Sequence, residues 1–358
     1  MSKQYHKTIL IVCEGEGTEP DYFKEIRDIL LQNEVDVAIE IKPRPKEKFK
    51  KEKFKLRKGA VKREIRKPEI VLPISEIEDK YIAQPTRYVR EAQIGLEDNT
   101  YDEVWAIFDK DGHPKHKEAF ELAEVNVGGK KVNIAFNSIA FEYWILLHFE
   151  SNATAFSKSM CREAKEPLNC GSNKHQNDCQ GANCVCGRIV NQTFLDYEEG
   201  KKSFDFKKFH PNVNSAIQRA ILLRKSYIGN TNPIYKLNPY TNTDRLVYKL
   251  LHLDKFDLIW FQFNEIQSQN SLAITFNYQN QIVDIMVNKV GNATIILTTD
   301  LFCLFDINGN KLDSGQREVM TGDVFTFSID LNIIQNFNPL FIGIRKNEQE
   351  YLITELPI

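Results

Sequence analysis

A short apolar run that ends in an acidic, glycine-containing turn constrains the fold of this chain most. Residues 8–12 are apolar or β-branched and predict a buried strand, and the turn at residues 13–17 follows directly. A helix is expected at once, with Thr18 and Asp21 spaced as a capping box. A strand that leads straight into a helix is typical of an α/β fold.

The same alternation of strand and helix patterns continues to about residue 150. Further strands are expected at residues 35–41, 104–108 and 132–136, and further helices at 86–96, 114–125 and 141–149, the last capped by Ser138. Residues 104–108 are almost entirely apolar, as in a strand whose two faces are both covered. The pattern predicts an α/β fold with a mostly parallel sheet flanked by helices.

The pattern changes twice in the second half of the chain. Helical periodicity returns at residues 213–221 and 246–253 and predicts a helical extension. From residue 256 onward, short runs rich in Phe, Ile, Val and Thr alternate with Asn- and Gly-containing turns, which predicts a β-sandwich-like domain. We therefore expect an α/β domain over residues 1–255 and an all-β accessory domain over residues 256–358.

The cellular setting is read from what the sequence lacks. No apolar run approaches the roughly 18–20 residues of a membrane-spanning helix, and the N-terminal residues lead into the first strand without a signal-peptide pattern. We therefore expect a cytoplasmic protein with no membrane partner.

Charge is divided unevenly along the chain. The overall net charge is −2, but residues 256–358 hold 5 Lys/Arg and 12 Asp/Glu, whereas residues 1–255 carry a net charge of +5. A basic arm at residues 42–67 has 14 Lys/Arg against 3 Glu, with Phe49 and Phe54 interleaved. Such an arm favours salt-sensitive binding to nucleic acid, although a basic run can also be a solvated tail. The candidate phosphate ligands in it are Lys50, Lys51, Lys53, Lys55, Arg57 and Lys58.

Acidic side chains follow two of the predicted strands. Glu14 ends the first, and Asp109 and Asp111 end the strand at residues 104–108. Ligands of parallel sheets bind at the carboxyl ends of strands, and carboxylate oxygens suit Mg²⁺ or Mn²⁺. The alternative is that the aspartates cap the next helix and that Glu14 is solvated. Lys110 and His113 could contact substrate phosphate or lie on a solvated helix face.

Blocks at residues 13–23, 104–111, 140–149 and 238–242 resemble the RloB family of Toprim-like proteins, over roughly residues 8–255. The resemblance implies a Toprim-type sheet in which a strand-end Glu and an Asp-x-Asp bind divalent metal for phosphodiester chemistry. It also implies a prokaryotic anti-phage or restriction-linked setting, often beside an ABC-type or AAA-type ATPase. Related Toprim effectors act as ribonucleases on tRNA.

Carried onto this chain, the resemblance gives Glu14, Asp109 and Asp111 metal-binding and acid–base roles. Glu19 and Glu142 are further acidic positions inside the matching motifs. Because Glu142 lies in an apolar helix, burial of an unpaired carboxylate there would be costly. It is expected to meet a metal or a cation, to face a cleft, or to form a structural ion pair.

A cysteine-rich insertion interrupts the chain at residues 157–190. Its five cysteines suggest a structural zinc site, although they lack paired C-x2-C units. A redox-sensing loop and unligated thiols are the alternatives. The candidate ligands are Cys161, Cys170, Cys179, Cys184 and Cys186. This insertion and the basic arm both depart from the family pattern.

Taken together, these observations predict an Mg²⁺- or Mn²⁺-dependent nuclease whose substrate is RNA, with tRNA as a candidate, acting in anti-phage defence. The alternative is a non-catalytic scaffold that binds nucleic acid and a partner ATPase. Hydrolysis of a small nucleotide would leave the basic arm without a role. The all-β domain is expected to bind such an ATPase or another copy of the chain.

Overall fold

A computed structural model of the chain describes residues 7–15, 17–43, 85–110, 114–156, 185–190, 209–260, 272–279, 282–289, 302–312, 317–321, 324–330, 341–345 and 350–355. Several predicted sites lie outside these residues. They are Asp111, His113, the basic arm from residue 44 onward with its six candidate ligands, and Cys161, Cys170, Cys179 and Cys184. Their roles therefore stay predictions. Of the cysteine-rich insertion, the structure describes the short helix α5 (Val185–Val190), which contains Cys186.

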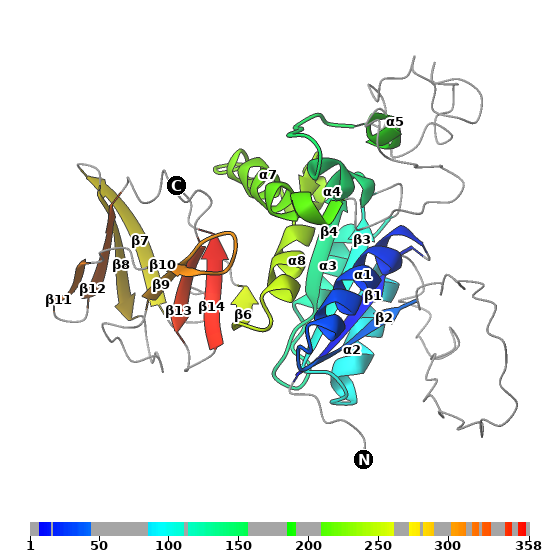
Figure 1. The fold of residues 1–358 in the computed structure, drawn as a ribbon, viewed down its shortest axis with the longest axis horizontal. Coiled ribbons are helices and arrows are strands. Elements are labelled where there is room, and N and C mark those ends of the chain that lie inside the picture. The colour runs from blue at the N-terminus through cyan, green and yellow to red at the C-terminus, as the bar shows by residue number, and fades with distance from the viewer. Residues whose placement is uncertain are drawn as a thin grey trace, which may run out of the picture.

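The central sheet is mostly parallel, as predicted. Its described strands are β1 (Lys7–Cys13), β2 (Val37–Lys42), β3 (Glu103–Asp109), β4 (Asn133–Ser138) and β5 (Tyr240–Thr241). They lie in the order β2-β1-β3-β4-β5, visible in part in Figure 1. The first three pairings are parallel, and β5 pairs antiparallel with β4. The carboxyl ends of β1, β3 and β4 therefore meet at one edge of the sheet.

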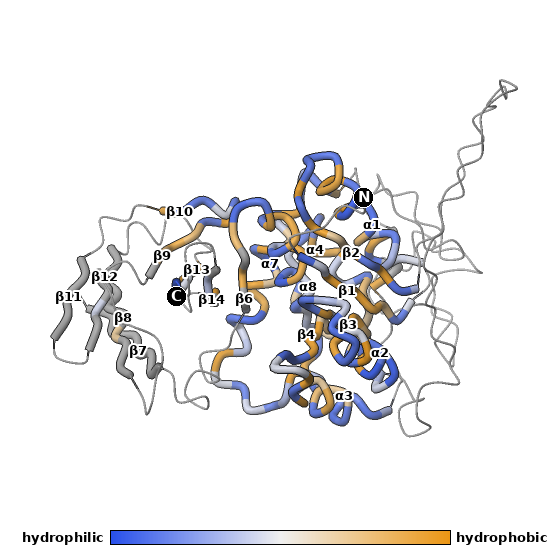
Figure 2. The backbone as a smooth tube through the Cα atoms, turned by 90° about the horizontal axis from the view of Figure 1, so that it is seen from below, coloured by the Kyte–Doolittle hydropathy of each residue, from blue (hydrophilic) through white to orange (hydrophobic). Residues whose placement is uncertain are grey.

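Helices cover both faces of this sheet. The helices are α1 (Thr18–Gln32), α2 (Thr86–Glu97), α3 (His116–Ala123), α4 (Glu142–Leu147), α7 (Val213–Lys225) and α8 (Thr243–Leu251). Ile9 and Ile11 of β1 pack in one buried cluster with α1, α4, α7 and α8. Leu10 and Val12 pack in the other cluster, with α2 and α3. Because side chains alternate along a strand, β1 serves two cores. Figure 2 shows orange, hydrophobic stretches in these strands and blue ones in outer turns.

Two predicted helix caps are wrong. The residue that caps α1 is Gly17, with no side-chain hydrogen bond, and Thr18 is already the first helical residue. A capping side chain needs a residue with non-helical backbone, so Thr18 cannot form the predicted capping box. Ser138 belongs to β4, and Phe141 precedes the first helical residue of α4.

The C-terminal part contains two described sheets. One has the order β10-β9-β13-β14-β6, with β6 (Asp257–Trp260), β9 (Phe302–Phe305), β10 (Lys311–Leu312), β13 (Phe341–Arg345) and β14 (Glu350–Glu355). The other is antiparallel, with the order β11-β12-β8-β7: β7 (Leu272–Gln279), β8 (Ile282–Lys289), β11 (Arg317–Thr321) and β12 (Val324–Asp330). The β character predicted for this part of the chain is confirmed for the residues that the structure describes there.

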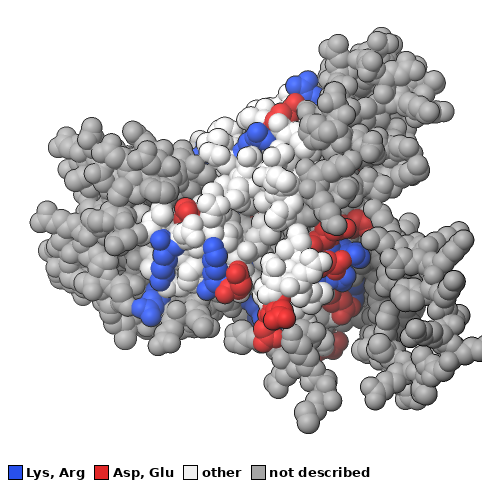
Figure 3. All heavy atoms as spheres, viewed as in Figure 1, with Lys and Arg blue, Asp and Glu red and all other residues white. Residues whose placement is uncertain are grey.

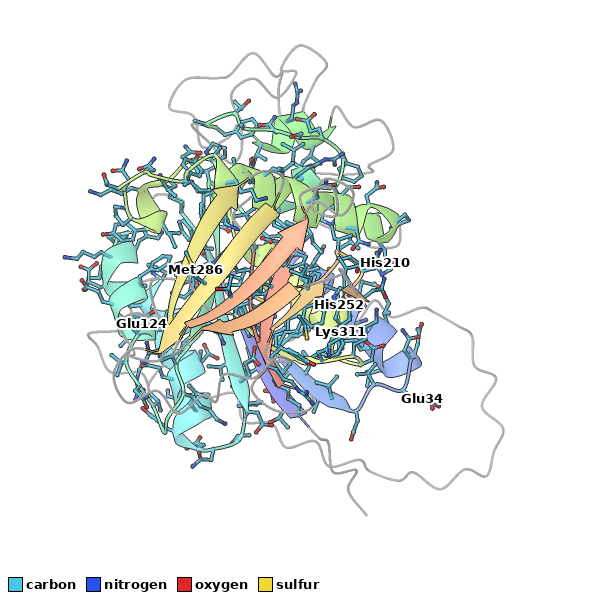
Figure 4. The ribbon with its side chains drawn as sticks, turned by 90° about the vertical axis from the view of Figure 1, so that its left-hand side faces the viewer. Glu34, Glu124, His210, His252, Met286 and Lys311 are labelled. Carbon is cyan, nitrogen blue, oxygen red and sulfur yellow. The ribbon has the colours of Figure 1, made fainter. Side chains whose placement is uncertain are left out.

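The first of these sheets packs directly on the helical part. Tyr248 of α8 donates a hydrogen bond from its hydroxyl to the carbonyl of Asp306 at 2.8 Å. The ring of His252 lies against Gly309, where an added Cβ would be 2.3 Å from the ring atom Cδ2. Figure 4 labels His252, together with Lys311 of β10. Because one buried cluster spans this junction, the domain boundary at residue 255 stays a prediction.

The described surface carries both signs of charge. On the face shown in Figure 3, Lys and Arg residues lie among Asp and Glu residues, without a broad basic patch on the described residues there. None of the described helices has the length and hydropathy that crossing a bilayer requires.

A largely buried ion pair at the start of β3 gives the fold a defined acid sensitivity. Glu103 Oε2 lies 2.5 Å from Lys249 Nζ and 3.1 Å from Lys7 Nζ. Burial alone would raise the pKa of Glu103, but the charges of the two lysines outweigh it and lower the pKa from 4.5 to about 2. The ionised carboxylate therefore stabilises the fold above pH 4.5, and this contribution is lost as the pH falls toward 2.

We expect Glu103→Gln to lower the free energy of unfolding by about 3 kcal/mol at pH 7, in line with this pKa difference. The difference from the wild type should fall to less than about half of that value at pH 3. Urea unfolding at both pH values measures it, with Glu124→Gln as the control, since Glu124 is 62% exposed in its pair with Lys131. An equal loss of unfolding free energy in Glu103→Gln at pH 3 and pH 7 would contradict this account.

Candidate metal and catalytic site

The ends of β1 and β3 are joined by two hydrogen bonds that involve Glu14. Cys13 is in register with Ile107, and the amide of Glu14 continues the ladder by donating to the Ile107 carbonyl at 2.9 Å. The Glu14 side chain then turns across the end of β3. Its Oε2 accepts a hydrogen bond from the Asp109 amide at 2.8 Å. Two acids that are 95 residues apart in the sequence thus meet at the carboxyl edge of the sheet.

Asp109 is held in place from the opposite side by a histidine. It is the last residue of β3 and is 8% exposed. Its carbonyl accepts a hydrogen bond from His116 Nε2 at 2.9 Å. The imidazole packs against Phe108 and Phe136, with ring centroids 6.2 and 5.9 Å apart. Glu14 and His116 therefore fix both backbone groups of Asp109, and this limits the positions open to its carboxylate.

Glu19 adds a third carboxylate beside the first turn. It lies in the first turn of α1 and is buried. An added Cβ on Gly15 would come within 2.3 Å of its Oε2, so the carboxylate lies directly on this glycine. Burial, and secondarily the charge of Glu19, raise the pKa of the Cys13 thiol. The glycine of the acidic turn thus leaves room for Glu19 at the same strand end.

A comparison with protein-family models identifies the family of this chain. Residues 9–250 match the family model described as RloB-like protein. The chain belongs to the RloB-like family. Comparisons with curated proteins and with solved structures gave no significant match. The resemblance seen in the sequence is therefore confirmed at the level of the family.

In this RloB-like chain, Glu142 begins a helix on the same side of the sheet as α1. It is the first residue of α4 and is 4% exposed. Next to it, Phe141 packs edge-on against Tyr22 of α1, with ring centroids 5.5 Å apart. The Tyr22 hydroxyl also lies 3.3 Å from Nε2 of His148, at the end of α4. These contacts join the helices that carry Glu19 and Glu142, and a catalytic role for either acid stays a prediction.

Lys110 follows Asp109 but reaches another part of the chain. Its Nζ donates to the carbonyls of Lys236 and Leu237 at 3.2 and 3.3 Å. Burial lowers the pKa of this ammonium group. In the structure Lys110 therefore stabilises the segment before β5, and its predicted contact with substrate stays a prediction.

Asn137 lies beside the candidate site of this RloB-like chain, and the sequence analysis did not single it out. It lies at the end of β4, in register with Asp109, and is fully buried. Its Oδ1 accepts hydrogen bonds from the hydroxyls of Thr241 and Thr243, at 2.8 and 2.9 Å. Its Nδ2 has no hydrogen-bond partner among the residues that the structure describes. Its position, a polar residue directly after the predicted core strand at residues 132–136, was the sequence signal that could have identified it.

The oxygen donors at this edge suit a hard divalent cation. Glu14 and Asp109 offer carboxylate oxygens. One carboxylate has several lone pairs, so Glu14 can accept the hydrogen bond from the Asp109 amide and still bind a metal. Within the described ranges, which leave out Asp111, no three His, Cys, Asp or Glu side chains form a group that could hold a metal ion. Glu14 and Asp109 are the described candidates to hold Mg²⁺ or Mn²⁺, and their metal-binding role stays a prediction.

Proposed function

We propose that this RloB-like protein is a divalent-metal-dependent nuclease that cleaves RNA, with tRNA as the candidate substrate. The observation that carries the proposal is the hydrogen bond from the Asp109 amide to Glu14 Oε2. It joins the acids of two neighbouring parallel strands at the edge where α/β proteins bind their ligands. The family resemblance supports phosphodiester chemistry at such an edge.

The roles of the residues follow from their positions. A bound divalent cation supplies Lewis-acid stabilisation of the negative charge that develops on a phosphodiester. Glu14 and Asp109 would hold that cation, with Asp111 as the predicted third ligand. Glu19, buried beside Gly15, is the candidate to take the proton of an attacking water as general base. Glu142 is the second candidate for proton transfer, to the leaving oxygen of the cleaved strand.

The biological setting of the proposal rests on the family resemblance. It supports an effector of anti-phage defence that works with an ABC-type or AAA-type ATPase. The basic arm would supply affinity for the phosphate backbone, because each phosphate neutralised by Lys or Arg releases a counterion. Aromatic residues in the arm would favour unpaired bases.

The proposal is tested by incubating the purified full-length chain with total cellular RNA and with plasmid DNA. Reactions contain Mn²⁺, Mg²⁺ or a chelator, and the ends produced are sequenced. We expect cleavage of RNA that requires the metal and leaves defined ends. Tight, salt-sensitive binding of RNA without cleavage in any metal, with a partner ATPase present, would instead establish the scaffold.

A further inference from the structure

Three buried polar residues form a row across the central sheet at its carboxyl edge. Asp109 of β3 is in register with Asn137 of β4, and Asn137 is in register with Thr241 of β5. Side chains of residues paired in register point to the same face of a sheet. Asn137 and Thr241 are both 0% exposed. The row thus begins at a proposed metal ligand and continues into residues with no assigned role.

The two ends of the Asn137 amide have different surroundings. Its oxygen is held by the hydroxyls of Thr241 and Thr243, from β5 and α8. On its other side, β4 is paired with β3, the strand that carries the in-register Asp109. An N–H donor that is buried without a partner is costly, and Nδ2 has none within the described part of the chain. The Asn137 Nδ2–H group is thus a hydrogen-bond donor at the end of β4 that no described residue uses.

The orientation of this amide is itself supported. The Thr243 backbone amide donates to Thr241 Oγ1 at 3.2 Å, so that the Thr241 hydroxyl proton is directed toward Asn137. Arg224 Nη1 donates to the Thr241 carbonyl at 2.6 Å. Both hydroxyls that hold Asn137 therefore belong to a segment with its own fixed position.

We propose that Asn137 is a positioning residue of the site. Its Nδ2–H group makes no hydrogen bond to Asp109 or to another described residue in this structure, and it is the donor available to orient the in-register Asp109 carboxylate toward the cation. This inference rests on the proposed function. Because Asn137 is fully buried, it acts through Asp109 and does not touch the substrate. Groups that hydrogen-bond to metal ligands commonly change metal affinity by about 10- to 100-fold.

The test measures Mn²⁺ binding to the full-length protein by electron paramagnetic resonance, which needs no turnover. Asn137→Leu keeps the approximate size of the side chain and removes its hydrogen bonds, and we expect it to weaken Mn²⁺ binding by about tenfold. The matched control is Asn133→Leu at the opposite end of β4, where Asn133 Nδ2 donates to the Val104 carbonyl at 3.3 Å. The control should bind Mn²⁺ within about twofold of the wild type.

A second variant keeps Asn137 and removes one of its supports. Thr241→Val should weaken Mn²⁺ binding less than Asn137→Leu does, and the double variant should be no weaker than Asn137→Leu, because both act through one chain of hydrogen bonds. In RNA cleavage, Asn137→Leu should lower kcat with little change in KM. Wild-type Mn²⁺ affinity in a folded Asn137→Leu protein would overturn the proposal.

A metal-free readout separates this inference from the proposed function. The side-chain amide signal of Asn137 is assigned by nuclear magnetic resonance through its loss in Asn137→Leu. We expect Asp109→Asn to shift this signal and to leave that of Asn133 in place. If the wild type binds no Mn²⁺, the proposed function fails, and the amide signal alone then tests the positioning role. An Asn137 signal with the same chemical shift in Asp109→Asn as in the wild type overturns that role.

Discussion

Replacing Glu14 by Gln is expected to lower kcat for RNA cleavage by at least about 10²- to 10³-fold, the range seen when one charge-stabilising group is removed. The amide oxygen of Gln can still accept the hydrogen bond that the Asp109 amide now gives to Glu14 at 2.8 Å. The substitution therefore removes a charge and a ligand oxygen but preserves the connection between β1 and β3. Asp109→Asn should have an effect of similar size, because both residues would hold the same cation in the proposed site.

The control for this result is Glu118→Gln. Glu118 is exposed in the first turn of α3, the helix that follows β3, and it has the same charge. Cleavage is followed with a labelled RNA at saturating Mn²⁺, and thermal unfolding confirms that each variant is folded. Undiminished cleavage by folded Glu14→Gln and Asp109→Asn would remove these residues from the mechanism.

Arg224→Met is expected to lower the free energy of unfolding by about 3–5 kcal/mol, the cost of breaking a buried ion pair from one side. Arg224 is 8% exposed in its side chain and pairs with Asp244 through Nη1 and Nη2, at 2.5 and 2.6 Å. Its Nη2 also lies 2.5 Å from Glu355 of β14. Removal of the guanidinium leaves the buried carboxylate of Asp244 and the partly buried carboxylate of Glu355 without their shared cation.

The Arg224 prediction has a matched control on the surface. Lys130 and Asp102 form an ion pair at 3.9 Å with side chains 43% and 54% exposed, and Lys130→Met should cost at most about 1 kcal/mol. Chemical unfolding of both variants at pH 7 measures the difference. Equal, small losses for the two variants would show that the Arg224 network contributes little.

This network also connects the C-terminal sheet to the candidate site. Burial alone would raise the pKa of Glu355, but the charges of Arg224 and Arg245 outweigh it and hold the pKa below its ordinary range. Through the same guanidinium, β14 is joined to the carbonyl of Thr241, whose hydroxyl holds Asn137. The C-terminal sheet thus helps to hold the segment around Thr241, which in turn positions Asn137 beside the candidate site.

The sequence allowed the framework of the site to be predicted because that framework follows from local rules. Apolar runs located β1 and β3, and the rule that parallel strands present their carboxyl ends together brought Glu14 and Asp109 to one edge. Adjacency in the sequence was less informative about which side chains reach the site. Lys110 is next to Asp109, yet its side chain reaches the carbonyls of Lys236 and Leu237.

The contacts that could not be predicted join residues far apart in the chain. Asn137 and Thr241 are 104 residues apart, and Arg224 and Glu355 are 131 residues apart. No periodicity specifies which buried polar side chains will face each other once strands pair. The predicted caps of α1 and α4 failed for a different reason, because each depended on an exact helix boundary, which sequence patterns specify poorly.

The central claim is that Glu14 and Asp109 hold one divalent cation between them. Anomalous diffraction from crystals soaked in Mn²⁺ measures this directly. The account predicts a manganese peak at about 2.0–2.4 Å from a carboxylate oxygen of each residue, the range of metal–oxygen bonds for hard cations, and loss of the peak in Asp109→Asn. Manganese bound elsewhere, with neither carboxylate among its ligands, would contradict it.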